Sequence, residues 1–366
     1  MKRIINLAIA IIIIAPLSSC NSSRKLTASD AHEVKNVILL IGDGMGLSTV
    51  YAAMTVSAVP LNIERATTVG LQKTYSANSY ITDSGASATA IASGKKTYNG
   101  AIGIDASGNT AKSILEIAEE NGLSTGLVAT SAITHATPAS FVAHQASRAS
   151  YEDIALDFLK TDIDVFIGGG YNHFAKRTDK LNLIDSLKLK GYEVYTETDL
   201  LLQSKARKVA GLTAPIQHEY RLKGRGDMLP ASTGKAIEIL SKNQKGFFLM
   251  VEGSQIDWAA HANAADTLID ETLDFDRAAG IALDFAAKNG HTLVIITADH
   301  ETGGVTIVGG DMTSRKVQIN FSTANHTADM LPVYAFGPGS EKFTGIYDNT
   351  QLFQKILASM KLKKLK

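Results

Sequence analysis

Residues 37–44 read VILLIGDG, and this stretch decides which fold the sequence predicts. A strand with one face in water alternates apolar and polar residues, whereas a strand buried on both faces is apolar throughout. The unbroken run at 37–41 is of the second kind and is typical of parallel sheets covered by helices. The run ends in Gly-Asp-Gly, which places the carboxylate of Asp43 directly after the strand, between residues that allow a ligand to approach closely.

Other stretches of the chain repeat this pattern. They are STGLVAT (124–130), DVFIGGG (164–170), GFFLMVEG (246–253), TLVIITADH (292–300) and PVYAFGPG (332–339). Helical patterns separate them, for example at 111–122 and 270–290, and each of these two ends in Gly. The sequence therefore predicts one α/β domain over 36–366, with a mainly parallel central sheet flanked by helices on both faces. The charged segment 171–232 is expected to be a peripheral insertion.

The first twenty residues, MKRIINLAIAIIIIAPLSSC, indicate export. They combine a basic start, a short apolar run and small residues before Cys20, as secretory signal peptides do. Leu17-Ser18-Ser19-Cys20 resembles a bacterial lipobox, in which Cys20 becomes the lipidated first residue of the mature chain. An uncleaved anchor or an ordinary signal peptide is the alternative. Residues 21–35 are expected to be a tether, and the protein a membrane-anchored lipoprotein, periplasmic or at the cell surface of a Gram-negative bacterium.

Composition excludes several classes of function. The 36 basic and 36 acidic residues leave no net field that would attract nucleic acid. Cys20 is the only cysteine, so the mature domain has neither a disulfide nor a thiol nucleophile. Any partner must be bound by a local site.

Acidic and imidazole groups gather where predicted strands end. Asp43, Glu252 and Asp299 would face one crevice and repel each other strongly without cations between them. His300 adjoins Asp299, and Asp257 and His261 are four residues apart, on one face of a predicted helix. With His326, these residues favour a multinuclear metal site with nitrogen and oxygen ligands. Imidazole with carboxylate suits zinc, and an all-oxygen site suits magnesium.

The stretch ITDSGASATA at 81–90 is composed almost entirely of small residues. One interpretation is a tightly packed helix start with Asp83 or Ser84 as its N-cap. The other is that a ligand must approach the backbone here and that Ser84 is the reacting group. The stretch alone leaves both open.

Four motifs, in this order along the chain, resemble those of alkaline phosphatases. They are DSGASATAIASGKKTYNGAIGID (83–105), HATPASFVAHQASR (135–148), VEGSQIDWAAH (251–261) and TADHETGG (297–304). The resemblance extends over 36–359 and is weaker across 171–232. It implies an alkaline-phosphatase-like fold, a homodimer, and hydrolysis of small phosphate monoesters through a phosphoserine intermediate. The cofactors it implies are two Zn²⁺ and one Mg²⁺.

The same resemblance assigns roles to individual residues. Ser84 would be the nucleophile, with Arg148 holding two phosphate oxygens and Asp83 orienting Arg148. The implied ligands are Asp257, His261 and His326 for one zinc; Asp43, Asp299, His300 and Ser84 for the second; and Asp43, Thr137 and Glu252 for magnesium.

Two positions vary among relatives. His135 is either a group behind the ligands, which we favour, or a metal ligand that would shift the third site towards zinc. Trp258 either contacts substrate or packs at the rim of the site.

Three dications, the four carboxylate ligands, a serine alkoxide and Arg148 leave a net charge of about +2, which matches a dianionic monoester. The main alternative is a phosphodiesterase or phosphonate hydrolase of the same superfamily. Thr137, Glu252 and Arg148 argue against it, because such enzymes generally lack the third site and the arginine. A non-catalytic lipoprotein that binds phosphate or metal is the remaining alternative.

Overall fold

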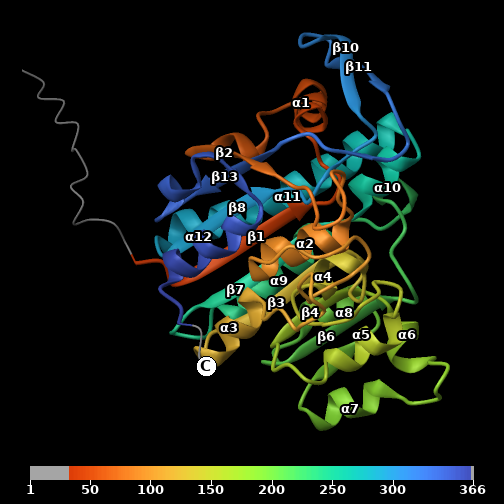
Figure 1. Ribbon diagram of the computed structural model, residues 1–366, viewed down its shortest axis with the longest axis vertical. Helices are drawn as coiled ribbons and strands as arrows, with labels where there is room; N and C mark the ends of the chain where they lie inside the picture. The colour runs from red at the N-terminus through yellow and green to blue at the C-terminus, as the bar shows by residue number, and fades with distance from the viewer. Residues whose placement is uncertain (1–32, 364–366) are drawn as a thin grey trace, which may run out of the picture. The chain divides into compact units, whose positions relative to one another are not determined.

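A ten-stranded sheet is the centre of the computed structural model, which describes residues 33–363 (Figure 1). The strand order is β14-β2-β13-β8-β1-β7-β3-β4-β6-β5, and all strands are parallel except β13. Their bounds are β1 Asn36–Gly42, β2 Thr68–Lys73, β3 Ser124–Ala132, β4 Val165–Gly169, β5 Glu193–Tyr195, β6 Val209–Ala214, β7 Phe247–Gly253, β8 Thr292–Thr297, β13 Leu331–Phe336 and β14 Gly345–Asp348.

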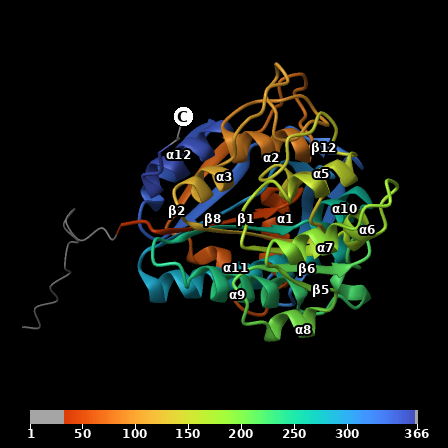
Figure 2. The ribbon, with the colours of Figure 1, turned by 90° about the horizontal axis from the view of Figure 1, so that it is seen from below.

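Helices cover both faces of this sheet, and Figure 2 shows the layers from the side. One layer contains α2 Ser84–Ser93, α3 Ile114–Glu120, α5 Tyr151–Asp157, α7 Leu183–Leu189 and α12 Thr350–Met360. The other contains α1 Leu47–Val56, α9 Met228–Leu240, α10 Gln255–His261 and α11 Ala265–Asn289. The predicted architecture, a mainly parallel sheet between two helical layers, is confirmed.

Smaller elements complete the chain. They are the helices α4 Ala136–Ala139, α6 Tyr171–Ala175 and α8 Thr198–Gln203, the 3₁₀ helices η1 Asn62–Arg65, η2 Arg221–Lys223 and η3 Ser340–Phe343, and two pairs of short strands, β9 Glu301–Thr302 with β12 His326–Thr327 and β10 Val305–Asp311 with β11 Lys316–Phe321. The pair β9–β12 brings His326 beside the segment that follows β8.

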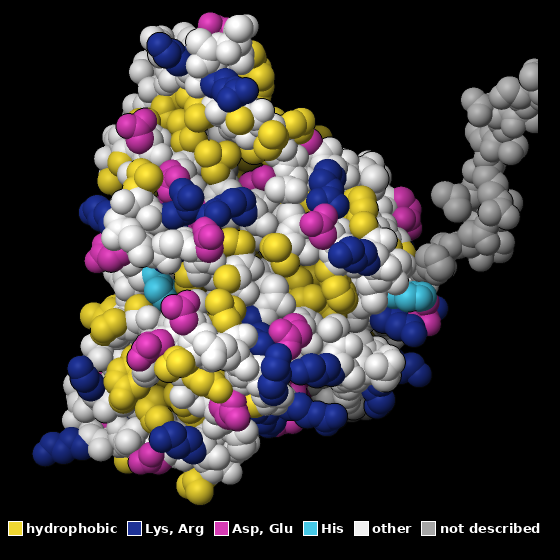
Figure 3. Space-filling model, turned by 180° about the vertical axis from the view of Figure 1, so that it is seen from behind, with side chains coloured by type: hydrophobic (Ala, Val, Ile, Leu, Met, Phe, Trp, Pro, Cys, Tyr) yellow, Lys and Arg dark blue, Asp and Glu magenta, His cyan; other side chains and the backbone are white. Residues whose placement is uncertain are grey.

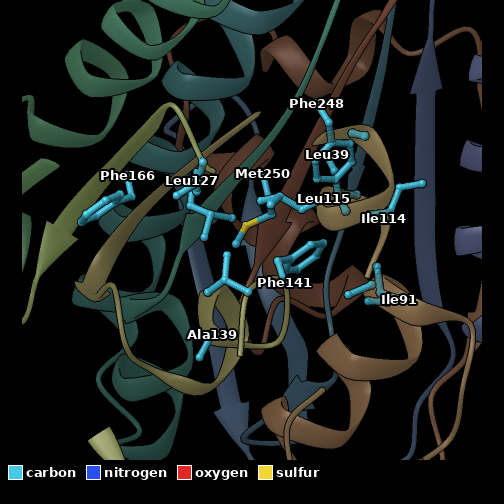
Figure 4. Close-up of a cluster of buried hydrophobic side chains, with 14 of the residues drawn as sticks. Leu39, Ile91, Ile114, Leu115, Leu127, Ala139, Phe141, Phe166, Phe248 and Met250 are labelled. Atoms are coloured by element: carbon cyan, nitrogen blue, oxygen red, sulfur yellow. The ribbon is translucent and has the colours of Figure 1, made fainter. Parts of the chain in front are cut away.

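The apolar run that predicted the fold supplies both halves of the core. Leu39 of β1 points into one helical layer, and its neighbours Ile38 and Leu40 point into the other, as the two-residue period of a strand requires. Figure 4 shows the first layer, in which Phe141 and Ile91 lie among the strand side chains. Each fully buried large apolar side chain stabilises the fold by about 1.5–3 kcal/mol relative to exposure.

The start of the domain and the segment 171–232 both belong to the ordered fold. Val34 is buried, and the backbone N–H groups of Lys35 and Asn36 both donate to the carbonyl of His291, so the ordered fold begins before residue 36. The predicted signal peptide, Cys20 and most of the predicted tether lie outside the described residues. Residues 171–232 contain β5 and β6, which extend the central sheet at one edge.

Within 33–363, none of the helices combines the length and the apolar character needed to cross a bilayer. The face in Figure 3 carries acidic, basic and hydrophobic side chains interspersed.

A buried ion-pair network fixes the segment after β6 to the rest of the domain. The guanidinium of Arg225 is fully buried and pairs with Glu271 at 2.6 Å and Asp274 at 2.7 Å, both on α11. It also donates to the side chain of Gln255, the first residue of α10. The amide of Gln255 donates in turn to the carbonyl of His218. One cation therefore ties together a loop and two helices.

We expect Arg225→Ala to lower the free energy of unfolding by about 3–5 kcal/mol, because it removes the buried cation from Glu271 and leaves Asp274 with the partly exposed Arg277 as its closest cationic partner. The measurement is urea unfolding of the metal-loaded protein. Arg65→Ala is the control, since Arg65 pairs with Asp284 at the surface and should cost less than about 1 kcal/mol. Equal losses in the two variants would contradict the role given to Arg225.

Candidate metal centre

The predicted ligands meet at the carboxyl edge of the sheet, where open parallel sheets bind their ligands. Asp43 follows β1, Glu252 is the second-last residue of β7, and Asp299 follows β8. Helix α10 starts two residues after β7 and adds Asp257 and His261. Together with three further histidines, these side chains form three groups. Within each group, the candidate ligand atoms lie within 4.8 Å of one another.

The first group consists of Asp257, His261 and His326. The Nε2 atoms of the two histidines are 3.2 Å apart, and Asp257 Oδ1 is 3.4 Å from His261 Nε2 and 3.6 Å from His326 Nε2. Each histidine has its Nδ1 at a backbone carbonyl: that of Ala324 for His261 and that of Thr82 for His326. Such contacts orient the rings so that both Nε2 atoms face the same point, as in protein metal sites.

The second group consists of Asp43, Asp299 and His300, all with fully buried side chains. His300 Nε2 lies 3.4 Å from Asp43 and 3.3 Å from Asp299. The hydroxyl of Ser84 is 3.2 Å from the same nitrogen. The structure therefore brings Ser84 to the edge of this group.

The third group consists of Asp43, Glu252 and His135. Thr137, two residues beyond His135, lies in the short helix α4 and is fully buried. Asp43 belongs to the second group as well, so one carboxylate connects the two. His135 lies among the candidate ligands, where the sequence had favoured a place behind them.

Buried polar atoms without partners indicate that cations belong here. Within residues 33–363, no hydrogen bond reaches either oxygen of Asp43, Oε1 of Glu252, Oδ2 of Asp299, Oγ1 of Thr137 or Nδ1 of His135. Buried polar atoms in proteins are nearly always paired. Their identities, carboxylate and hydroxyl oxygens with imidazole nitrogens, fit zinc and magnesium.

Electrostatics point to the same conclusion. Burial, followed by the neighbouring carboxylates Asp299 and Asp257, raises the pKa of Asp43 well above its ordinary value. Burial also raises the pKa of Glu252 to about 7 and that of Asp299 to about 6. Divalent cations would remove this penalty, because they stabilise the ionised carboxylates directly.

In the first group, the pKa of the carboxylate is lowered instead of raised. Burial would raise the pKa of Asp257, but its contact with His261 and the nearby imidazoles outweighs burial and lowers it. The same contact raises the pKa of His261 to about 9. Burial lowers the pKa of His300 to about 4, so this ring is neutral and able to bind a metal at neutral pH.

The small-residue stretch forms the start of α2. Asp83 is the N-cap: its Oδ1 accepts from the backbone N–H of Ala86 at 2.9 Å. All ten residues of α2 are buried, and a Cβ on Gly85 would come within 2.9 Å of the carbonyl oxygen of Ala101. The first interpretation is therefore confirmed: the helix start is tightly packed, with Asp83 as its N-cap. Ser84 lies at the metal groups, and its role as the reacting group stays a prediction.

Arg148 reaches the site from the loop before α5. Its Nη1 donates to Oδ2 of Asp83 at 2.9 Å, and the backbone N–H of Gly100 donates to the same oxygen at 3.0 Å. Burial lowers the pKa of Arg148, but the charge of Asp83 outweighs that effect and raises it. The guanidinium is thus held as a permanent cation by Asp83, the residue that precedes Ser84.

Some supporting residues were missed in the sequence. The Thr302 hydroxyl donates to Asp257 at 2.5 Å and lies 3.2 Å from His300 Nδ1, so it links the first and second groups. Ser131 contacts Glu252 at 3.3 Å and is itself held by Ser254. Thr302 lies within the motif TADHETGG, three residues after Asp299, and this position could have indicated that it supports the ligands.

Trp258 lies at the edge of the site. Its indole meets the ring of His135 edge-on, with centroids 5.7 Å apart. Because His135 belongs to the third group, this aromatic contact connects the metal groups to the surface beside α10.

Comparison with known proteins gives consistent matches. Residues 34–315 match the family model described as alkaline phosphatase. Alkaline phosphatase 3 of Bacillus subtilis (strain 168) is 36% identical, with 93% of this chain and 92% of the relative covered. The alkaline phosphatase of Escherichia coli (strain K12) is 34% identical, with 90% and 86% covered.

A solved structure matches equally well. The alkaline phosphatase from the Antarctic bacterium TAB5 has a TM-score of 0.87 and 46% identity, with 91% of this chain and 100% of that chain covered. A further structure of that enzyme is of a histidine-to-aspartate mutant with Mg bound in the M3 site.

We expect the metal-free protein to lose thermal stability as pH rises from about 7 to about 9. In this range, ordinary histidines are neutral in the unfolded chain, so the lowered pKa of buried His300 no longer changes stability. His261, whose pKa is raised to about 9, stabilises the fold while it is protonated, and this contribution is lost as pH rises from about 7 to about 9. Burial also raises the pKa of Asp43, so its ionisation acts in the same direction, whereas the penalty for ionising Glu252, with a pKa of about 7, is already nearly complete where this range begins.

The measurement is the Tm in EDTA across this range, with the protein in excess Zn²⁺ and Mg²⁺ as the control. Metal should raise the Tm throughout and reduce its dependence on pH. A metal-free Tm that stays constant or rises between these pH values would contradict the electrostatic account of the site.

Proposed function

Because this chain belongs to the alkaline phosphatase family and hydrolyses phosphate monoesters with the help of metal ions, we propose that Ser84 receives the phosphoryl group. Water would then hydrolyse the phosphoserine and release inorganic phosphate. The observation that carries this proposal is the position of Ser84: its hydroxyl is buried at the first turn of α2, 3.2 Å from His300 of the second metal group.

Serine is a weak nucleophile at its ordinary pKa and needs activation. His300 is neutral by burial and is shared with Asp43 and Asp299, so it is better placed to bind a cation than to accept the serine proton. Bound divalent ions at the first and second groups would stabilise the serine alkoxide and the departing oxygen. Helix α2 would add to this stabilisation, because the partial positive charge at its N-terminus favours the negative charge of the phosphate.

Arg148 and Asp83 would position the transferred group. A guanidinium can donate two parallel hydrogen bonds to two phosphate oxygens. Asp83 fixes both partners, because one of its oxygens caps α2 and the other holds Arg148. Ser84 and Arg148 are thereby held in one arrangement before substrate arrives.

We propose two Zn²⁺ ions, at Asp257, His261 and His326 and at Asp43, Asp299, His300 and Ser84. The third site, at Asp43, Thr137 and Glu252, would hold Mg²⁺ or, with His135 as a further ligand, Zn²⁺. The position of His135 in the third group supports the zinc alternative, since Mg²⁺ prefers oxygen ligands. The TAB5 mutant in which an aspartate replaces a histidine was described with Mg bound in its M3 site, in line with this preference.

Phosphodiester or phosphonate hydrolysis and a non-catalytic binding role are less well supported. Thr137 and Glu252 contribute oxygens to a third group, and Arg148 adds a cation beside Ser84, so the site suits a dianionic monoester.

The location of the protein is also proposed. Its sequence supports an exported lipoprotein anchored through Cys20, periplasmic or on the surface of a Gram-negative bacterium. A homodimer is the oligomeric state implied by the family resemblance.

We expect Ser84→Ala to lower kcat/KM for p-nitrophenyl phosphate by about a thousandfold or more, because it removes the nucleophile. Ser93→Ala, which is the same change at the other end of α2, is the matched control and should retain activity. Metal content measured beside the kinetics separates loss of the nucleophile from loss of a metal ion.

The ratio of kcat/KM for this monoester to that for bis-p-nitrophenyl phosphate tests the substrate class. The wild type should strongly prefer the monoester, and Arg148→Ala should lose much of that preference through a higher KM. A wild-type preference for the diester would overturn the proposal in favour of a phosphodiesterase.

For the anchor, we expect Cys20→Ser to abolish incorporation of labelled fatty acid and to move the protein from the membrane fraction to the soluble one. Ser22→Ala is the control, because it leaves the lipidation site intact. Lipid labelling that persists in Cys20→Ser would show that the lipobox interpretation is wrong.

A further inference from the structure

A pocket of about 210 Å³ lies at the edge of the metal centre, and it has no role in the phosphoryl transfer proposed for Ser84. Its walls come from the loop between β6 and η2 and from α10. The lining residues are Gln217, His218, Glu219, Tyr220, Gln255 and Trp258.

Trp258 joins this pocket to the reacting groups. It directly follows the candidate ligand Asp257, and its indole packs against His135 of the third group. The pocket is therefore a continuation of the site.

The pocket shares helix α10 with the metal group that the departing oxygen of a substrate would face. Ser84 approaches the phosphorus from the second group, at His300. Phosphoryl transfer keeps the attacking and departing oxygens in line. The departing oxygen therefore faces the first group, whose residues Asp257 and His261 belong to α10. The same helix supplies Gln255 and Trp258 to the pocket.

The inner wall of the pocket is preorganised. His218 has Nε2 at 2.8 Å from the hydroxyl of Thr213 and Nδ1 at 3.2 Å from the carbonyl of Thr130. Gln255 is held between Arg225 and the carbonyl of His218. A ligand would thus meet a fixed surface, which reduces the entropic cost of binding.

The remaining lining groups indicate what the pocket would bind. Trp258 and Tyr220 supply aromatic rings. Gln217 and Glu219 are exposed, and their side chains make no hydrogen bond with any other residue in 33–363. A cavity of about 150 Å³ can hold benzene, so this volume suits a ring system better than a polymer. The carboxylate of Glu219 accepts N–H donors and repels anions.

We propose that this pocket binds the leaving group of the substrate and selects a planar ring with N–H donors, such as the base of a nucleoside monophosphate. The proposal rests on the proposed function, because it places the phosphate of that substrate at Ser84. It adds a substrate class to a site that otherwise holds only phosphate.

The test compares adenosine 5′-monophosphate with methyl riboside 5-phosphate, in the metal-loaded enzyme. Both esters release the same kind of primary ribose hydroxyl, and they differ in the adenine. We expect kcat/KM to be about tenfold higher for the nucleotide. This is the gain in affinity expected when one base stacks on an aromatic side chain. Tyr220→Ala should remove most of this preference, and Tyr220→Phe should retain it. Tyr195→Ala, the same change on the edge strand β5, is the matched control.

A second measurement is independent of turnover. Trp258 is the only tryptophan of the chain, so its fluorescence reports on this pocket alone. Adenosine should quench it saturably in the wild type and in Tyr195→Ala, and weakly in Tyr220→Ala. Glu219→Lys, a change at an exposed position, should also weaken binding and serves if Tyr220→Ala fails to fold.

The outcomes distinguish the two proposals. If neither ester is hydrolysed, the proposed function fails. If both are hydrolysed equally and adenosine leaves the fluorescence unchanged, the function stands and the pocket proposal is overturned.

Discussion

Mutual repulsion between carboxylates at one edge of the sheet is the constraint on which the rest of the site depends. Asp43, Glu252, Asp257 and Asp299 are all buried there, and burial raises the pKa of three of them. A protein interior does not retain such a cluster in ionised form without cations. Ser84, Arg148 and the histidines are arranged around this requirement. The cations that would neutralise the carboxylates would also supply the positive charge that attracts an anionic phosphate.

The sequence predicted the fold because buried parallel strands are recognisable from continuous apolar runs. β1, β7 and β8 are the three clearest examples, and they carry Asp43, Glu252 and Asp299 at their ends. Their adjacency could be inferred from the rule that parallel strands end at one edge. The reversed direction of β13 could not, because PVYAFGPG is apolar whichever way the strand runs.

The candidate ligands were predicted from strand ends and motifs, which do not predict the residues that surround them. Thr302 links two groups because the short strand β9 lies against α10, where its hydroxyl reaches Asp257. The pairing of β9 with β12 also places His326 opposite Thr302. His135 joins the third group because α4 turns directly after β3. The loop at 217–220 is far from every motif in sequence, and only the tertiary fold, held by Arg225, brings it beside Trp258.

Asp43 belongs to two groups, and this has a consequence for how the centre is assembled. A cation bound at the second group would draw electron density from the shared carboxylate and make it a poorer ligand for the third, while it would also fix the side chain in place and remove an entropic cost. The two occupancies would then be coupled. The affinity measured at one position would depend on whether the other is filled, and by the same factor in both directions.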